Sequence, residues 1–392
     1  MSKWGVTAAT ATGPTIRGWG VNQPVSQGWS TGPQGRITGY DDPAPGAFRD
    51  KVAVCTWCGY DAATYLKVMQ TLITAGVTWL RTDFDWSTIQ PTSASLFSWA
   101  SPDIIMTAAA KSRMNVLAIL DYCAPWASSK GTQPGYITLF PPVRNSDYAN
   151  FCAAVVARYG PGGTFWTLHP ELVPSPLTAA ELGNEPWGSW FALPQPDPSR
   201  FAGMALAAAV AIKAVNSSVQ VIIPADLYQA RSDGLTFQPW GPAVFTAAPT
   251  LATYTDKISF HPYPSNICPD PLDDGHNLDQ GFYAKALIAR DVVCATAGKL
   301  LPVWITEVGW TTATGTSNGV SEADAATYTN HLLGRALQTN GESLPYRSAI
   351  EKVFIFGYKN SNGNMADAEG NYGIMHSDGT PKPAWAEILK YT

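Results

Sequence analysis

The chain has few charged residues and no long uninterrupted apolar run. Asp, Glu, Lys and Arg make up 14% of its 392 residues, and the formal net charge is -5. Nucleic-acid binding needs a basic face, so this balance argues against a DNA or RNA partner. No stretch approaches about 18 consecutive apolar residues, so we expect no membrane span. With 45% hydrophobic residues, the chain can still bury a large core.

An apolar leader is also missing from the start of the chain. It opens with Met1-Ser2-Lys3-Trp4-Gly5, and no apolar core followed by a small-residue cleavage site appears there. We therefore expect no secretory signal peptide.

Metal-binding motifs are sparse. Cys55 and Cys58 form one C-x-x-C pair without a second pair or a His-rich partner, so we expect neither zinc nor a redox role. Disulfide pairing among the six cysteines is not decided by the sequence. One long polar loop carries acidic residues that match no defined calcium loop. They are Asp270, Asp273, Asp274 and Asp279. We expect no metal site and no cofactor.

Eight mostly apolar runs follow residue 50, and such runs are typical of parallel strands buried on both faces. The expected strands are Lys51–Trp57, Thr78–Asp83, Asn115–Tyr122, Thr178–Gly183, Ser218–Ala225, Lys257–Pro262, Leu301–Glu307 and Lys352–Tyr358. Helical patterns alternate with them, at Asp61–Ala75, Pro102–Arg113, Asp147–Tyr159, Ser199–Val215, Pro239–Thr246, Asp279–Ala297, Ser321–Thr339 and Pro383–Leu389. Eight alternations predict an α/β fold of the (β/α)8 barrel type over residues 49–392.

Residues 1–48 differ from the rest of the chain. They are rich in Gly, Thr, Pro and Gln, and they repeat Gly-Trp pairs at Gly18-Trp19 and Gly28-Trp29. Neither a helical nor a strand period runs through them. We predict an irregular N-terminal extension that contributes no barrel strand. It would serve as a docking element or as a strap across the barrel.

Two short segments carry the chemistry, because each places a glutamate where an expected strand ends. They are Glu181-Leu182-Gly183-Asn184-Glu185-Pro186-Trp187 and Ile305-Thr306-Glu307-Val308-Gly309-Trp310. In (β/α)8 barrels the active site lies at the carboxyl ends of the strands. A single glutamate at a strand end is most often a surface charge. Two carboxylates delivered to one cleft are what glycosidic bond cleavage requires.

Aromatic residues also gather just past the expected strand ends. An aromatic ring stacks on the apolar face of a sugar, although the same enrichment suits a protein interface. The residues concerned are Trp57, Trp86, Tyr122, Trp126, Trp187, Trp190, Tyr263 and Trp310.

Seven short segments, in order along residues 50–390, resemble clan-A glycoside hydrolases of the family 39 and family 5 type, which are retaining β-glycosidases. The segments are Trp79–Trp86 with Ile89–Thr92, Leu117–Tyr122 with Pro125–Ala127, Ala157–Gly160, Gly183–Pro186, Ser259–Tyr263, Ile305–Trp310, and Asn371–Ile374 with Lys382–Ala384.

The resemblance implies a role for each candidate residue. Glu185 would be the acid/base and Glu307 the nucleophile. Arg81 would hydrogen-bond the nucleophile, or serve only as a structural ion-pair partner. Asn184 would bind the sugar 2-hydroxyl. The remaining substrate-binding candidates are Asp121, Tyr122, Trp126, Trp187, His261, Tyr263, Trp310 and Tyr358; a neutral core imidazole is the alternative for His261.

Two positions depart from the pattern of that family. Many relatives carry Trp directly before the Asn-Glu pair, where this chain has Gly183. Many also end strand eight with Trp, where this chain has Phe356-Gly357-Tyr358. Both departures bear on which sugar is bound and leave the reaction type unchanged.

The leading hypothesis is a retaining glycoside hydrolase that cleaves a polysaccharide. The alternative is a phage tail or adhesin-type structural protein that uses a hydrolase barrel to bind glycans without turnover. A hydrolase whose substrate lies outside cells usually needs export, yet we expect no signal peptide in this chain. A bacteriophage tail-associated or lysis enzyme that acts on a bacterial cell-envelope glycan would meet both conditions. Such a protein would contact phage tail proteins through residues 1–48. An intracellular oligosaccharide-trimming glycosidase is the rival setting.

Overall fold

Eight parallel strands form a closed barrel in a computed structural model of the chain, in the order β10-β3-β4-β5-β6-β7-β8-β9. The structure describes residues 4–7, 15–19, 42–226, 239–264, 266, 268–273, 282–338, 349–361 and 363–392. The barrel strands are β3 (Val52–Cys55), β4 (Trp79–Asp83), β5 (Asn115–Leu120), β6 (Ala179–Leu182), β7 (Gln220–Pro224), β8 (Lys257–Phe260), β9 (Val303–Val308) and β10 (Ile350–Phe356). Each overlaps one expected strand, so the predicted (β/α)8 fold is confirmed.

Burial on both faces explains why the apolar runs became these strands. Every residue of β3, β6 and β9 is buried, which leaves no polar face to alternate with an apolar one. The chain divides into two compact units. One holds Met1–Thr56, Ala75–Val77 and Phe260–Thr392, and the other holds Trp57–Thr74 and Thr78–Ser259.

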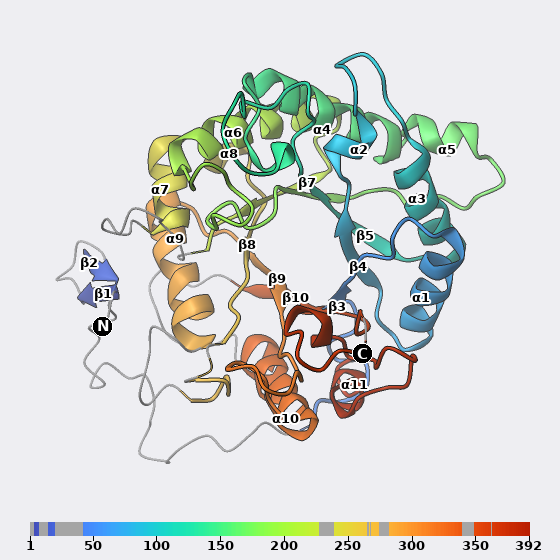
Figure 1. Ribbon diagram of the computed structural model, residues 1–392, viewed down its shortest axis with the longest axis vertical. Coiled ribbons are helices and arrows are strands. Elements are labelled where there is room, and N and C mark those ends of the chain that lie inside the picture. The colour runs from blue at the N-terminus through green and yellow to red at the C-terminus, as the bar shows by residue number, and fades with distance from the viewer. Residues whose placement is uncertain are drawn as a thin grey trace. The chain divides into compact units, whose positions relative to one another are not determined.

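The unit of residues 57–74 and 78–259 contains the consecutive parallel pairs from β4 to β8. Arg81 pairs with Leu117 across β4 and β5, and Leu117 pairs with Ala179 across β5 and β6. The helices are α1 (Ala62–Thr74), α2 (Trp86–Ile89), α3 (Ala100–Ser112), the 3-10 turn η1 (Ile137–Leu139), α4 (Asn145–Tyr159), α5 (Thr164–Leu168), α6 (Pro198–Val215), α7 (Trp240–Ala247) and α8 (Leu251–Tyr254). Helices α3, α4 and α6 lie around the outside of the strands of this unit (Figure 1).

Helix α6 has a well-defined start. Asp197 accepts a hydrogen bond from the Arg200 backbone amide at 2.9 Å, and Pro198 occupies the first turn, where its missing N–H costs nothing. By length and composition alone α6 could cross a membrane, but that is weak evidence because core helices pass the same test. It packs against α4 and α7 as a core helix of the barrel does.

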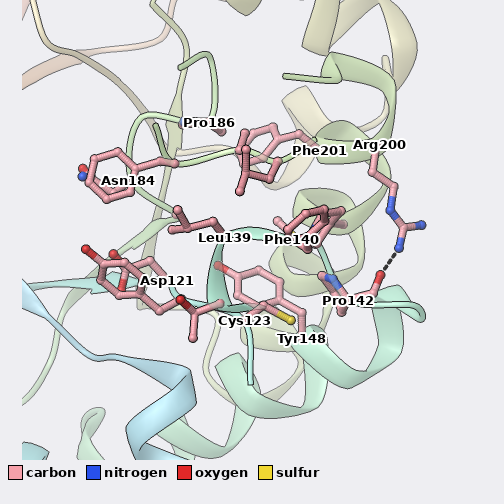
Figure 2. Close-up of a pocket in the computed structure, with 18 of the residues that line it drawn as sticks. Asp121, Cys123, Leu139, Phe140, Pro142, Tyr148, Asn184, Pro186, Arg200 and Phe201 are labelled. Carbon is pink, nitrogen blue, oxygen red and sulfur yellow. Dashed lines mark hydrogen bonds between the residues drawn. The ribbon is translucent and has the colours of Figure 1, made fainter. Parts of the chain in front are cut away.

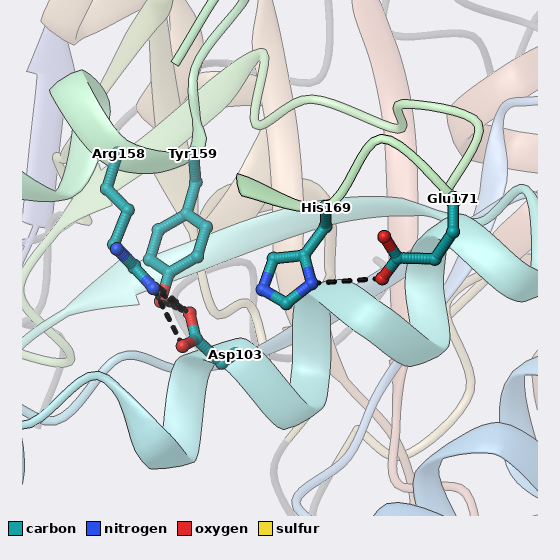
Figure 3. A network of polar contacts seen from close by, with 5 residues as sticks. All are labelled: Asp103, Arg158, Tyr159, His169 and Glu171. Carbon is teal, nitrogen blue, oxygen red and sulfur yellow. Dashed lines mark hydrogen bonds and ion pairs between the residues drawn. The ribbon is translucent and has the colours of Figure 1, made fainter. Parts of the chain in front are cut away.

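A polar cluster joins α3 to α4. Arg158 on α4 donates to both carboxylate oxygens of Asp103 on α3, at 2.9 and 2.7 Å from its Nη2 atom. The Tyr159 hydroxyl donates to the same carboxylate at 2.5 Å. Nearby, His169 pairs with the exposed Glu171 (Figure 3). A bidentate arginine–carboxylate pair fixes the spacing of the two helices.

The unit that ends the chain contains β3, β9 and β10 with the helices that follow them. Two expected helices each divide into an α-helical part and a π-helical part. The segments are η2 (Tyr283–Ile288) with α9 (Ala289–Ala297), α10 (Glu322–Leu333) with η3 (Gly334–Gln338), the 3-10 turn η4 (Glu369–Asn371) and α11 (Pro383–Leu389). Helices α10 and α11 pack side by side (Figure 1).

Lys382, at the start of α11, anchors the loop that follows β10. Its ammonium donates to Thr312 Oγ1 at 2.8 Å, to Asn360 Oδ1 at 2.9 Å and to the Asn371 carbonyl at 3.1 Å. Burial lowers the pKa of Lys382 to about 8. The loop thereby presents Tyr372 from a fixed backbone.

Strands β1 (Trp4–Thr7) and β2 (Thr15–Trp19) pair with each other antiparallel. Within the described residues, all eight barrel strands begin at or after Val52. The first 48 residues therefore supply none of them where the structure describes them.

Candidate active site

The two candidate catalytic glutamates lie at the carboxyl ends of barrel strands. Glu185 is three residues beyond the end of β6, and Glu307 is the penultimate residue of β9. This is the end of a (β/α)8 barrel where loops from several strands assemble catalytic groups. The surroundings of each glutamate lie within one of the two units and are described in turn.

A buried ion pair underlies the Asn184-Glu185 segment. Arg81 Nε lies 2.6 Å from Glu181 Oε2, and both side chains are essentially inaccessible to solvent. Arg81 Nη2 also donates to Asn184 Oδ1 at 2.8 Å. Because the guanidinium is planar and forked, it fixes both partners in one geometry. This orients the Asn184 side chain directly before Glu185.

The backbone after β6 explains why glycine stands at position 183. Gly183 has φ +87°, a left-handed conformation that glycine adopts without strain and tryptophan does not. Its amide donates to the Leu120 carbonyl at 3.0 Å, which ties the turn to β5. Glu185 also has a positive φ, of +40°. Non-glycine residues are held in this region only where the surroundings impose it, often at functional sites.

Trp190 is the aromatic partner of Glu185. Its indole Nε1 donates to Glu185 Oε2, and 47% of the Trp190 residue is exposed. Trp187, an expected sugar-binding residue, is only 2% exposed, so its ring is covered by protein. Trp190 therefore provides the accessible ring beside Glu185.

Asp121 lies just past the end of β5 and is buried. Burial, reinforced by the negative charges of Asp83 and Asp85, raises its pKa well above the usual range, although Arg81 opposes this.

Tyr122 and Trp126 follow Asp121 in the same loop. Tyr122 has φ +53° and its ring lies 6.0 Å from that of Phe191. Trp126 donates to the Gln90 carbonyl at 2.8 Å and packs edge-on against Trp86. Through these contacts Trp126 holds the loop after β5 to α2.

In the other unit, Glu307 accepts a hydrogen bond from the Tyr263 hydroxyl at 2.9 Å on its Oε2 atom. His261 Nδ1 lies 3.6 Å from the same oxygen, and His261 Nε2 lies 3.1 Å from Thr306 Oγ1. His261 and Glu307 are both buried. The ring of His261 therefore lies between Thr306 and the Glu307 carboxylate and limits the rotation of that carboxylate.

Aromatic rings hold Tyr263 in place. Its ring makes edge contacts with Tyr372 at 5.7 Å and Phe356 at 6.3 Å, and Lys285 donates to its carbonyl at 2.7 Å. Trp310 is 8% exposed and donates to the Pro269 carbonyl at 2.8 Å, so it too is largely committed to packing. Tyr358 is half-buried just past β10.

Two members of this constellation were missed from the sequence. Glu181 was named only as the first residue of the Glu181–Trp187 segment, and the available signal for its role was a charge inside the expected strand Thr178–Gly183. Trp190 was noted only as one aromatic residue among many. Its position five residues after Glu185, in a loop, was the available clue.

All six cysteines are free thiols. In the acidic loop, Asp270 pairs with His331 Nδ1 at 2.8 Å, which gives that carboxylate a structural partner. Asp274 and Asp279 lie outside the described residues, so the expectation for the whole loop stays a prediction.

No protein-family model and no curated protein sequence matches this chain. Solved structures do. A family 39 glycoside hydrolase from the gut symbiont Bacteroides cellulosilyticus WH2 matches with a TM-score of 0.58 and 20% identity, over 87% of this chain and 63% of that one. A monomeric beta-xylosidase from Caulobacter crescentus CB15 matches with a TM-score of 0.60 and 16% identity, over 90% and 69%.

An exo-beta-1,4-mannosidase, Op5Man5 from Opitutaceae bacterium strain TAV5, matches with a TM-score of 0.53 and 15% identity, over 90% of this chain and 62% of that one. This chain thus spans about two thirds of the length of these structures. At such identities the likeness establishes the barrel fold. The structural neighbours include family 39 glycoside hydrolases, as the sequence resemblance implied.

Proposed function

We propose that this chain is a retaining glycoside hydrolase that cleaves a polysaccharide by double displacement. Glu185 protonates the leaving oxygen while Glu307 attacks the anomeric carbon and forms a glycosyl-enzyme. Glu185 then takes a proton from water, which attacks the same carbon and releases Glu307. The observation that carries the proposal is that both glutamates stand at the carboxyl ends of barrel strands, each with a fixed hydrogen-bond donor.

The donors around each glutamate support these separate roles. A nucleophile must be ionised and correctly aimed, and the Tyr263 hydroxyl donates to a Glu307 oxygen. Glu185 meets an indole N–H and sits on a backbone whose position is set by Gly183 and Asn184. With its Oδ1 atom held by Arg81, Asn184 directs its amino group elsewhere, and the sugar 2-hydroxyl is the partner we assign to it.

The stereochemical outcome tests the mechanism. Retention of the anomeric configuration is expected in the first-formed product, and proton NMR of a fresh digest reads it directly. A retaining mechanism requires the carboxyl groups of Glu185 and Glu307 to lie about 5–5.5 Å apart in a glycan complex, whereas inversion requires roughly 6.5–9.5 Å. An inverted product would refute the nucleophile assignment and leave the two-carboxylate reaction in place.

A finer proposal concerns the setting. We assign the substrate to a bacterial cell envelope and residues 1–48 to docking on a bacteriophage tail. The support is compositional, since these residues are rich in Gly, Thr, Pro and Gln. Co-sedimentation of the chain with purified virions tests it. A chain absent from virions that trims soluble oligosaccharides would replace it with the intracellular setting.

A further inference from the structure

Trp190 presents a large aromatic ring to solvent beside the proposed acid/base, with 47% of the residue exposed. A single exposed apolar side chain is normal and needs no explanation by itself. What sets Trp190 apart is its indole N–H, which donates to Glu185 Oε2. The acid/base meets the leaving oxygen of the substrate. The exposed ring therefore borders the group at which the leaving oxygen must arrive.

Two turns in the loop after β6 fix the backbone around Trp190. The Gly188 amide donates to the Glu185 carbonyl at 2.9 Å. The Gly188 carbonyl in turn accepts hydrogen bonds from the amides of Phe191 at 3.0 Å and Ala192 at 2.9 Å. Both turns meet at Gly188, so they hold the backbone on each side of Trp190 relative to Glu185.

One face of the Trp190 ring rests on Gly188. A Cβ atom added at position 188 would overlap Cε2, Cζ2 and Cδ2 of the indole, three atoms of its six-membered ring. Close approach to all three at once places Gly188 under the face of the ring and not at its edge. With this face covered and the N–H directed at Glu185, the opposite face and the outer edge supply the exposed surface.

The same loop directs other side chains to an apolar cavity of about 310 Å³, which lies within the unit of residues 57–74 and 78–259. Figure 2 shows Asn184 and Pro186 beside this cavity. Within the described part of the chain its lining also includes Phe191 and Leu193, but not Trp190. Burial of an apolar ring stabilises a fold by about 25 cal/mol for each Å² removed from water. The loop forgoes that gain at Trp190, which points to a ligand for the ring.

A pyranose suits a ring exposed in this way. The C–H groups on one face of the sugar pack on the indole, while the hydroxyls around the sugar's edge stay in water. The proposed mechanism brings two parts of the substrate to Glu185, the sugar that is attacked and the leaving group. The leaving group departs before water takes its place at Glu185, so its site must open to solvent. The half-exposed Trp190 meets that condition.

We propose that the exposed face of Trp190 binds the first sugar of the leaving group, so that the chain cleaves a bond between two pyranose units. The inference rests on the proposed function of Glu185. It defines the leaving side of the substrate as a pyranose with an unsubstituted C–H face. It also places the selectivity for that sugar in the loop after β6.

Substrates that differ only in the leaving group test the proposal. A β-glycosyl fluoride has no ring on its leaving side, whereas the β-1,4-linked disaccharide of the same sugar has one. The xylosyl, glucosyl, galactosyl and mannosyl pairs would be compared, and the pair with the fastest turnover used. We expect Trp190→Ala to reduce kcat/KM at least about tenfold more on the disaccharide than on the fluoride, since only the disaccharide loses a stacking contact. Equal losses on both substrates would overturn the proposal.

Trp190→Phe separates the ring from its N–H. Phenylalanine keeps an aromatic face but cannot donate to Glu185. We expect this variant to retain most of the preference for the disaccharide. If Trp190→Phe lost as much of it as Trp190→Ala, the hydrogen bond to Glu185 would explain the effect, and the ring would not be the binding surface.

Gly188→Ala displaces the ring without removing it, because the added methyl group occupies the place of the indole. It should reduce the preference for the disaccharide as Trp190→Ala does. Gly363→Ala is the matched control, since a Cβ atom there meets no heavy atom of the described residues within 4 Å. Circular dichroism confirms folding of both variants. A folded Gly188→Ala protein with the parent's preference would refute the platform.

Binding without turnover separates this inference from the proposed function. The chain with 5-fluorotryptophan and Glu307→Ala would be titrated with xylobiose, cellobiose, galactobiose and mannobiose, and followed by fluorine NMR. The Trp190 resonance is the one that Trp190→Phe removes, and we expect at least one disaccharide to shift it. Such a shift, in a parent protein that hydrolyses no glycan, would support the platform and refute the hydrolase. Glycan hydrolysis by the parent without any such shift would refute the platform alone.

Discussion

Glu307→Ala is expected to lose turnover on every glycoside, because without a nucleophile no glycosyl-enzyme forms. Glu185→Ala should lose roughly 10²–10⁴-fold on a glycan, the usual contribution of a general acid, and far less on an aryl glycoside with an activated leaving group. Added azide should then rescue Glu185→Ala by attacking the glycosyl-enzyme in place of activated water. Steady-state rates on a nitrophenyl glycoside and on the glycan, each with and without azide, measure both the loss of turnover in each variant and the rescue by azide.

The matched control is Glu171→Gln. Glu171 is an exposed glutamate paired with His169 (Figure 3), and its loss should leave both rates unchanged. If instead Glu185→Ala lost turnover on every glycoside and azide rescued Glu307→Ala, Glu185 would be the nucleophile and Glu307 the acid/base. Full activity in both would refute the hydrolase proposal and leave a glycan-binding barrel.

Arg81→Met is expected to destabilise the fold by about 3–5 kcal/mol, because it leaves the Glu181 carboxylate buried without its cation. The double variant Arg81→Met with Glu181→Leu should recover most of that stability, since apolar residues commonly replace a buried ion pair at little cost. Activity should not recover with it, because Asn184 still lacks the donor that orients its side chain. Urea unfolding and kcat/KM, measured on the same preparations, separate the two effects.

Arg158→Met is the matched control for the arginine. Arg158 forms a bidentate pair with Asp103, but both side chains keep partial solvent access. In Arg158→Met, water therefore solvates the Asp103 carboxylate, and the loss of folding stability should be smaller than for Arg81→Met. If activity returned in the double variant, Arg81 would be a structural residue without influence on the site.

The barrel and the location of its chemistry followed from local sequence. Strands buried on both faces must be apolar at nearly every position, so β5 and β9 were recognisable as runs without reference to the rest of the chain. Parallel strands place their carboxyl ends together, so Glu185 and Glu307 could be assigned to one end of the barrel. Helix boundaries were also close, although the π-helical segments at Tyr283–Ile288 and Gly334–Gln338 were not foreseen.

The partners of the site residues depended on tertiary structure. Arg81 and Glu181 are 100 residues apart in the chain, and their side chains meet only because β4, β5 and β6 lie consecutively in the sheet. The same holds for Tyr263 and Glu307, which belong to successive strand ends. Which of two neighbouring tryptophans is accessible was likewise set by packing, since Trp187 is buried and Trp190 is exposed.

The sequence by itself determined the strands, their order along the chain and the two carboxylates at their ends, because burial and alternation act on neighbouring residues. Only the tertiary structure decided which donors hold those carboxylates, why Gly183 precedes Asn184, and that an apolar cavity lies against Asn184 and Pro186. Those features arise where loops from separate strands meet. Their geometry depends on backbone torsions and on contacts between residues far apart in sequence, which no local pattern records.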